Sequence, residues 1–283
     1  MSFYVSAIIL GLGFSLLALG IFLSLRVFNF PDITTDGSFT LGGAVTAVML
    51  INGYHPLTTL IVTMIFGAVA GMCTGIIHAK MKVNPLLAGI LMMTALYSVN
   101  LVIMGRSNIP LIEQRKIFDT IHLSELFSMI LFTAVFWILL SLLLKTDFGL
   151  AMRATGNNEQ MIRSLGVNTD RMKITGLAVS NSLTALSGYL IVQYQGFADI
   201  NMGIGIVILG LGSVMIGEIF VKHSVTNIFI ILAAVILGSI LFRLVLAAAL
   251  AWGIDAVYLK LVVALVVLAV VGIPNFINFR KTT

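Results

Sequence analysis

The sequence predicts an all-α protein that crosses a membrane about eight or nine times. Of the 283 residues, 59% are hydrophobic and only 10% are charged, whereas soluble domains carry about 25% charged residues. The mean hydropathy is +1.11, and apolar stretches repeatedly approach or exceed the roughly 20 residues that cross a bilayer as a helix. We expect membrane segments at about 3–25, 38–53, 57–79, 84–104, 125–145, 174–194, 203–221, 224–248 and 256–277.

These segments leave little of the chain outside the bilayer. We therefore expect one transmembrane domain, residues 1–283, with no soluble domain and no cofactor of its own. The start lacks a basic region and a small-residue cleavage site, so no removable signal peptide is expected. Cys73 is the single cysteine and the four histidines are separated, so neither a disulfide nor a metal site is expected. The net charge of +5 is divided among short loops and does not indicate nucleic-acid binding.

The loop at 146–173 is the most informative polar part of the chain. It contains four basic residues, and such residues are retained on the cytoplasmic side during insertion. Placing this loop inside puts most of the 16 basic residues on the cytoplasmic side. The N-terminus is then outside and the C-terminus is cytoplasmic. The basic residues of the loop are Arg153, Arg163, Arg171 and Lys173.

A short helix is expected inside this loop. Asn157 or Asn158 can cap its start, and Gly166 can end it. Residues at positions i, i+1 and i+4 form a small apolar stripe. A short helix with such a stripe is suited to docking in the groove of another protein, although a charged loop resting on lipid headgroups is an alternative. The stripe consists of Met161, Ile162 and Leu165.

The run ATGNNEQMIRSLGVNTDRMK resembles the coupling segment of ABC-importer permeases of the branched-chain amino-acid and ribose type. In that family, Ala-Thr-Gly-x-Asn, a short helix, and then Gly and an aliphatic residue meet the ATPase subunit. The matching positions are Ala154, Thr155, Gly156, Asn158, Gly166 and Val167. The family's Glu-Ala-Ala element is replaced here by Gln160, Met161 and Ile162. The resemblance implies that an ATPase would be contacted by Gly156, Asn158, Met161, Ile162, Arg163, Leu165 and Gly166.

The chain also resembles itself at a shift of 167 residues. Asp32-Ile33 aligns with Asp199-Ile200, and Phe30 aligns with Phe197. We expect repeat one at about 3–104, a connector helix at 125–145, the cytoplasmic coupling loop at 146–173, and repeat two at about 174–277. The copies begin five crossings apart and so point in opposite directions. They would form two inverted four-helix repeats, an arrangement that many transporters use for alternating access.

Residues 29–38 interrupt the first repeat. Pro31 and Gly37 disfavour a continuous helix, and the stretch is too polar to face lipid. Acidic groups in such places are candidates for function. The alternative is a turn in which Ser38 or Asp36 caps the next segment. The stretch resembles the Asp-Leu-Ser-x-Gly-Ser motif of the same permeases, which implies a substrate pathway lined by Asp32, Thr34, Thr35, Asp36 and Ser38.

The corresponding stretch at 196–203 is the expected outward counterpart. Asp199 and Asn201 either line the entrance of the pathway or turn the chain. Near the end of the following segment, Glu218 is expected to pair with Lys222 or to brace the coupling loop. The loop at 105–124 either contacts a solute-binding protein or is a solvated connector.

The resemblance implies a non-catalytic permease subunit of a bacterial ABC importer in the inner membrane. Its cargo would be a small organic solute such as an amino acid, and some similar permeases are linked to aromatic amino acids. Its partners would be a cytoplasmic ATPase that uses the ATP, a second permease copy, an extracytoplasmic solute-binding protein and membrane lipid. The alternative is an ion-coupled secondary transporter, which would use Asp32 and Asp36 for the ion and would not need a docking helix.

Overall fold

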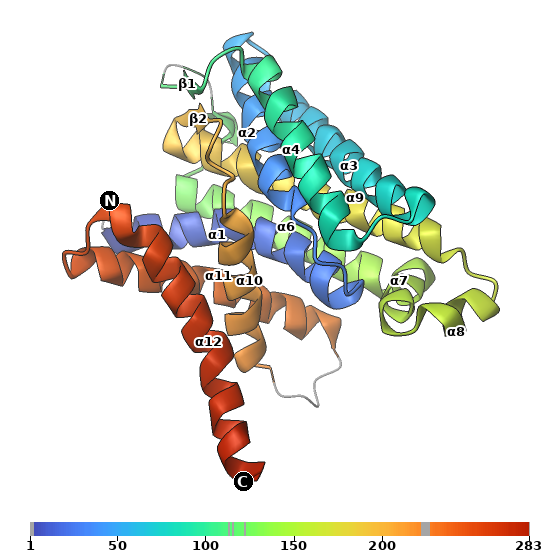
Figure 1. Cartoon of the computed structure of the whole chain (residues 1–283). Coiled ribbons are helices and arrows are strands. Elements are labelled where there is room, and N and C mark those ends of the chain that lie inside the picture. The colour runs from blue at the N-terminus through green and yellow to red at the C-terminus, as the bar shows by residue number, and fades with distance from the viewer. Residues whose placement is uncertain (1–2, 113, 115, 122, 222–226, 283) are drawn as a thin grey trace.

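The computed structural model describes every residue except 1–2, 113, 115, 122, 222–226 and 283. The described chain is a helical membrane protein (Figure 1), and six helices are long and apolar enough to cross a bilayer. They lie at Phe3–Val27, Pro56–Met81, Pro85–Met104, Glu125–Lys145, Thr169–Gln195 and Ile228–Ala251.

The elements follow one another along the chain with short connections. The first half contains α1 (Phe3–Ile21), η1 (Phe22–Val27), α2 (Thr34–Ile51), α3 (Pro56–Met81), α4 (Pro85–Met104), β1 (Asn108–Pro110), α5 (Ile117–Ile121) and α6 (Glu125–Lys145). The second half contains α7 (Asp147–Asn157), α8 (Glu159–Ser164), α9 (Thr169–Gln195), β2 (Phe197–Asp199), α10 (Ile206–Ile219), α11 (Ile228–Ala251), η2 (Ala256–Tyr258) and α12 (Leu259–Thr282).

Local sequence signals set the helix ends. Pro85 occupies the first turn of α4, where its missing N–H costs nothing, and the Asn84 side chain accepts the Leu86 N–H at 3.0 Å. The same helix ends at Gly105, whose φ of 64° is in the left-handed region that glycine tolerates. Proline also begins α3, so both helices start where the sequence predicts.

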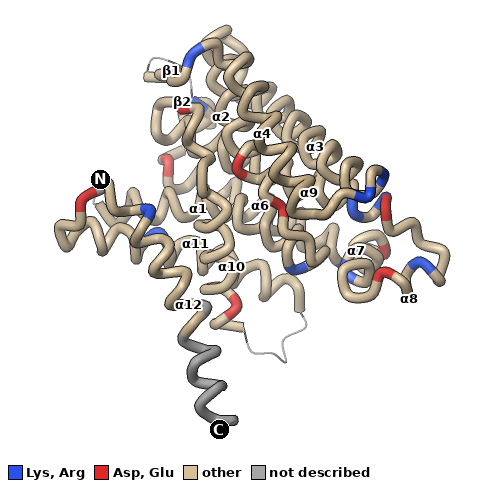
Figure 2. The backbone as a smooth tube through the Cα atoms, viewed as in Figure 1, with Lys and Arg blue, Asp and Glu red and all other residues tan. Residues whose placement is uncertain are grey.

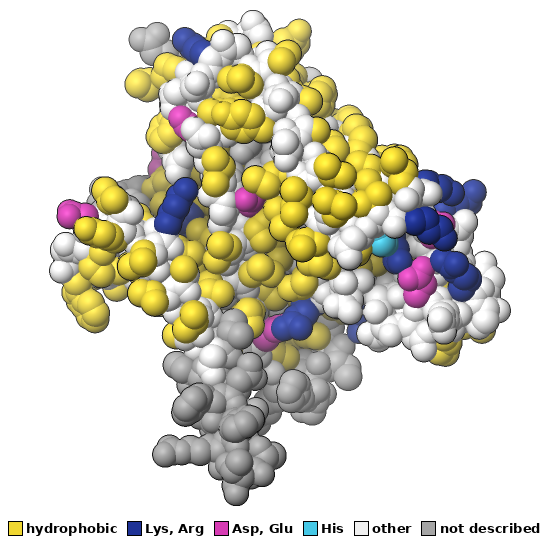
Figure 3. Space-filling view, in the orientation of Figure 1, with side chains coloured by type: hydrophobic (Ala, Val, Ile, Leu, Met, Phe, Trp, Pro, Cys, Tyr) yellow, Lys and Arg dark blue, Asp and Glu magenta, His cyan; other side chains and the backbone are white. Residues whose placement is uncertain are grey.

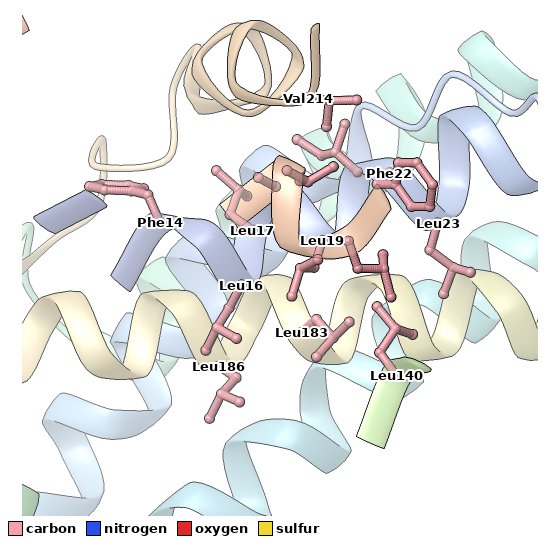
Figure 4. Close-up of a cluster of buried hydrophobic side chains, with 14 of the residues drawn as sticks. Phe14, Leu16, Leu17, Leu19, Phe22, Leu23, Leu140, Leu183, Leu186 and Val214 are labelled. Carbon is pink, nitrogen blue, oxygen red and sulfur yellow. The ribbon is translucent and has the colours of Figure 1, made fainter. Parts of the chain in front are cut away.

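Helices α1 and α9 form the centre of the molecule, and α3, α2 and α11 pack around them. Figure 4 shows Leu16 and Leu19 of α1 facing Leu183 and Leu186 of α9. Glycine brings α9 into backbone contact with its neighbours. A Cβ at Gly42 of α2 would lie 2.7 Å from the Ala185 Cα, so only glycine allows the helices this approach.

The outer helices present an apolar surface, as expected for helices in lipid. Hydrophobic side chains cover the face over α3 and α4 in Figure 3. Charged residues gather instead around α7 and α8, at one end of the molecule (Figure 2). This separation agrees with a polar loop that projects from one side of the bilayer.

Two predicted boundaries were wrong. The segment at 203–221 contains only the 14-residue helix α10, about 21 Å long at 1.5 Å per residue and shorter than the roughly 30 Å hydrocarbon core. The segment at 38–53 starts earlier, at Thr34, and its polar first turn keeps α2 out of the set of long apolar helices. The predicted coupling loop at 146–173 holds α7, α8 and the start of α9, so it contains more helix than the one short helix expected. The repeat organisation stays a prediction.

Candidate functional site

The predicted interruption lies between α1 and α2. The last turns of α1 widen into the π-helix η1, and the chain then runs through residues 28–33 without regular structure. Asn29 has a φ of 52°, in the left-handed region that asparagine tolerates. The Asp32 Oδ1 atom accepts the Thr34 N–H at 2.9 Å and so starts α2. The break therefore places a carboxylate and a new helix start inside the protein.

Asp32 is the centre of a buried polar network. The Asn181 Nδ2 atom of α9 donates to Asp32 Oδ2 at 2.7 Å, and the Ser38 hydroxyl donates to Asn181 Oδ1 at 2.7 Å. The Thr34 and Thr74 hydroxyls are 2.8 Å apart, which adds α3 to the network. Asp32 is 6% exposed and the other members are fully buried. Hydrogen bonds to the carboxylate compensate its removal from water.

Asn181 was missed in the sequence. Its signal is an amide in a membrane helix, which must find partners because lipid offers none. The sequence could therefore have marked Asn181 as a residue facing the protein interior, but it could not have named Asp32 and Ser38 as its partners, which lie 149 and 143 residues away.

Asp36 joins α2 to the second half of the chain. Its two carboxylate oxygens accept the backbone N–H groups of Gly205 at 2.8 Å and Val207 at 2.9 Å. Asp36 thus caps the start of α10, where free N–H groups and the helix dipole favour a negative charge. The alternative in which Asp36 or Ser38 caps the start of α2 is not observed. Thr35 lies beside them and donates its hydroxyl to the Asp32 carbonyl at 3.0 Å.

Asp199 and Asn201 lie apart from this network, in the turn around β2. Strands β1 and β2 pair antiparallel, with Asn108 opposite Asp199. The Asp199 carboxylate accepts the Asn201 backbone N–H at 2.8 Å and the Asn108 side chain at 3.2 Å. These bonds stabilise the turn. The Asn201 side chain is exposed.

The coupling segment consists of α7 and α8. Asn158, one of the two predicted caps, accepts the Met161 N–H at 3.0 Å. Gly166 follows α8 with a φ of 84°, so a glycine is favoured there. Both predictions for the ends of this short helix are confirmed.

The apolar stripe of α8 does not face outward as a unit. Met161 is 59% exposed and Leu165 is 68% exposed, but Ile162 is 8% exposed. Ile162 is therefore mostly covered by its own chain, and its contact with an ATPase stays a prediction. A helix of this length presents one face to its own chain, and Ile162 lies on that face.

Glu159 joins α8 to the start of α9. Its carboxylate accepts from Lys173 Nζ at 2.7 Å, from Arg163 at 3.0 Å and from the Thr169 hydroxyl at 3.1 Å. The hydrogen bond from Lys173 is the largest cause that lowers the pKa of Glu159 below its ordinary value of 4.5. Arg163 also lies 3.7 Å from Asp170. The predicted coupling residue Arg163 therefore stabilises the segment itself.

The coupling segment packs directly against the helix break. A Cβ at Gly156 of α7 would lie 2.8 Å from the Val27 carbonyl carbon and 3.0 Å from the Phe28 Cα. On α9, Gly176 faces the Phe28 ring in the same way. A displacement of α7 must therefore be transmitted to the backbone that precedes Asp32.

Glu218, at the end of α10, pairs with Arg26 of η1. This ion pair joins the second half of the chain to the break. The partner expected from the sequence, Lys222, lies outside the described residues.

Known proteins are similar to this chain along most of its length. The family described as "Branched-chain amino acid transport system / permease component" matches residues 3–272. A tyrosine transport system permease protein of Clostridioides difficile (strain R20291) is 40% identical over 284 residues, which cover 100% of this chain and 95% of that protein. An autoinducer 2 import system permease protein of Salmonella typhimurium is 28% identical over 247 residues, covering 85% and 70%. No solved structure matches the chain.

Proposed function

The chain belongs to the family of permease components of branched-chain amino acid transport systems, and we propose that it carries an amino acid inward through the membrane. It is the permease subunit of an ABC importer for a small organic solute, and we propose that a partner ATPase chain uses the ATP. Tyrosine is the first cargo to test, because the 40% identical relative is named for tyrosine transport. An ion-coupled secondary transporter is no longer favoured, since the family is that of transport-system components.

The observation that carries this proposal is the contact between the coupling segment and the helix break. An ATPase that binds α8 would meet the exposed Met161 and Leu165 side chains. Its movement would reach α9 through the bond between Glu159 and Lys173, and would reach the break through the backbone contact of Gly156. Five of the predicted pathway residues, at 32–38, lie within or immediately beyond that break.

We also propose the inverted repeats and the orientation. Helices α1, α2, α3 and α4 would correspond to α9, α10, α11 and α12. The order of a long helix, an irregular stretch and a helix recurs in both halves and supports this correspondence. The basic residues around α7 and α8 support a cytoplasmic position for that end. The N-terminus would then be outside and the C-terminus cytoplasmic.

The working assembly would contain two permease copies, two ATPases and one outer receptor. The family supports the ATPase and a solute-binding protein. The second permease copy is proposed in addition to these partners. The paired strands β1 and β2 would lie on the outer face, and the loop at 105–124 would be near the receptor.

The first test concerns docking. The double variant Met161→Asp with Leu165→Asp should reduce co-purification of the ATPase at least about tenfold, because the lost burial of each apolar side chain is worth about 1.5–3 kcal/mol and 1.4 kcal/mol is tenfold in affinity. Ile112→Asp is the matched control, since Ile112 is 84% exposed but belongs to the loop at 105–124. Uptake of radiolabelled tyrosine by proteoliposomes with receptor and ATPase should fall with docking.

The orientation of the chain in the membrane is measured by thiol labelling. A cysteine at Asn157, in a Cys73→Ser background, should react with an impermeant thiol reagent only from the ATPase side. Normal co-purification by the double variant would show that α8 is not the docking element, and labelling of Asn157→Cys from the opposite side would overturn the orientation.

A further inference from the structure

A small pocket lies between α2, α4 and the turn that precedes α10. Asp36 and Thr40 of α2, Tyr97 and Asn100 of α4, and the turn at 200–204 line it. Its volume of about 30 Å³ exceeds the roughly 10–15 Å³ that a cavity needs to hold one water molecule. The pocket can hold an ammonium-sized group but not a whole amino acid.

The side-chain oxygen of Asn100 is a buried acceptor that receives no hydrogen bond from any residue that the structure describes. Its Nδ2 atom donates to the Gly37 carbonyl at 3.1 Å, and this bond fixes which end of the amide is nitrogen. Asn100 is 1% exposed, and its Oδ1 atom has no hydrogen-bond partner among the described residues. Buried amide oxygens in proteins are nearly always paired, so the side chain is arranged for a donor that comes from elsewhere.

Asp36 adds negative charge to the same pocket. Each of its oxygens accepts one backbone N–H, whereas a carboxylate can accept about four hydrogen bonds. Within the described part of the chain, no Lys or Arg nitrogen lies within 4.0 Å of it, and Lys260 acts on it only through longer-range electrostatics. A buried charge at membrane depth favours a cationic partner.

Thr40 contributes a third oxygen. Its hydroxyl donates to the Asp36 carbonyl at 3.2 Å, so the lone pairs of its oxygen are available to a donor. Asp36, Thr40 and Asn100 all line the pocket, and each carries a side-chain oxygen with unused capacity to accept a hydrogen bond. Tyr97, which is 46% exposed, places an aromatic ring at the pocket's margin.

We propose that this pocket binds the ammonium group of the transported molecule. An ammonium group has three donors and no acceptor, which complements the three side-chain oxygens, and its size suits the volume. A carboxylate or phosphate would instead face the Asp36 carboxylate and the Asn100 amide oxygen, which accept hydrogen bonds and cannot donate them. The inference rests on the proposed function and assigns the amino group of the cargo to this pocket, which excludes a cargo without a primary amine. The remainder of the molecule would extend past Tyr97.

The test uses thiol labelling of the full chain in membranes with its ATPase, in the Cys73→Ser background. For each cysteine, the rate of labelling by the cationic reagent aminoethyl methanethiosulfonate is divided by the rate with the anionic sulfonatoethyl reagent. This rate ratio should be at least about tenfold higher at Tyr97→Cys than at Tyr54→Cys. Tyr54 is a matched control, because it is 56% exposed in the loop between α2 and α3. Tyramine should protect Tyr97→Cys, whereas 3-(4-hydroxyphenyl)propionate, which lacks the ammonium group, should not.

Two variants identify the acceptor. Asn100→Leu should bring the rate ratio at Tyr97→Cys down to the control value, and Asn100→Asp should raise it, which a general folding defect would not do. Equal ratios at Tyr97→Cys and Tyr54→Cys, or equal protection by the two small molecules, would mean that the pocket holds only water and would overturn the proposal. That result would leave ATPase docking unchanged, so it would be distinguishable from failure of the proposed function.

Discussion

The tight contact between Gly156 and the helix break gives a quantitative prediction for Gly156→Ala. The added methyl would lie 2.8 Å from the Val27 carbonyl carbon and 3.0 Å from the Phe28 Cα. Carbon atoms are in comfortable contact at about 3.5–4.0 Å, and the Val27 carbonyl oxygen lies closer to the methyl than either carbon, so α7 or the break must move by more than about 1 Å. The atoms that are met belong to the backbone and cannot rotate away. Such overpacking costs about 1–3 kcal/mol, and better helix propensity returns at most about 1 kcal/mol.

We therefore expect Gly156→Ala to lower the apparent unfolding temperature in detergent by about 2–4 °C for each kcal/mol lost. It should also lower ATP-driven uptake while ATPase co-purification stays normal, because Met161 and Leu165 are unchanged. Gly272→Ala is the control: Gly272 lies in α12, and a Cβ there meets nothing within 4 Å. Wild-type stability and uptake in Gly156→Ala would refute the argument that α7 and the break move together.

Two further predictions concern the buried network and the coupling segment. Asn181→Leu leaves Asp32 Oδ2 and the Ser38 hydroxyl without their partner, so the variant should lose about 1–3 kcal/mol for each unsatisfied group, and unchanged thermal unfolding would contradict the network. The pKa of Glu159 is lowered from its ordinary value of 4.5, mainly by Lys173. The ionised Glu159 side chain therefore contributes its full stabilisation well above pH 4.5, and this stabilisation disappears as the pH falls through the lowered pKa. The apparent unfolding temperature of Glu159→Gln should therefore be below that of the wild type at pH 7 and should converge with it in acid; a constant difference would exclude this titration.

The sequence predicted those features that depend on nearby residues. Long apolar helices follow from hydropathy alone, and the ends of α8 follow from Asn158 and Gly166, which act within a few residues of their own positions. The interruption before α2 was also visible, because Pro31 and the carboxylates do not suit a lipid-facing helix. Local chemistry determines each of these features.

Features that depend on distant contacts were not predictable. The oxygens of Asp36 meet N–H groups about 170 residues away, so a reader of the sequence assigns them to the nearest helix start instead. Ile162 looks like a docking residue until α8 is placed, because an apolar side chain can face its own chain or a partner equally well. The length of α10 was overestimated because Gly203, Ile204 and Gly205 carry no polar side chain that would mark where the helix begins.

The two carboxylates of the first break attach different parts of the second half to α2. Asp32 is bonded to Asn181 of α9, and Asp36 is bonded to the start of α10. Hydrogen bonds to charged groups are worth about 1.5–3 kcal/mol each. If the two halves rock against each other during transport, as we propose, α2 cannot move away from both helices without exchanging these bonds for others. In the proposed scheme, a bound ammonium group would donate hydrogen bonds to Asp36 when the N–H groups at the start of α10 withdraw. Cargo would thereby lower the cost of the movement that carries it, and transport of a cargo without an ammonium group would be slow even if the receptor delivered it.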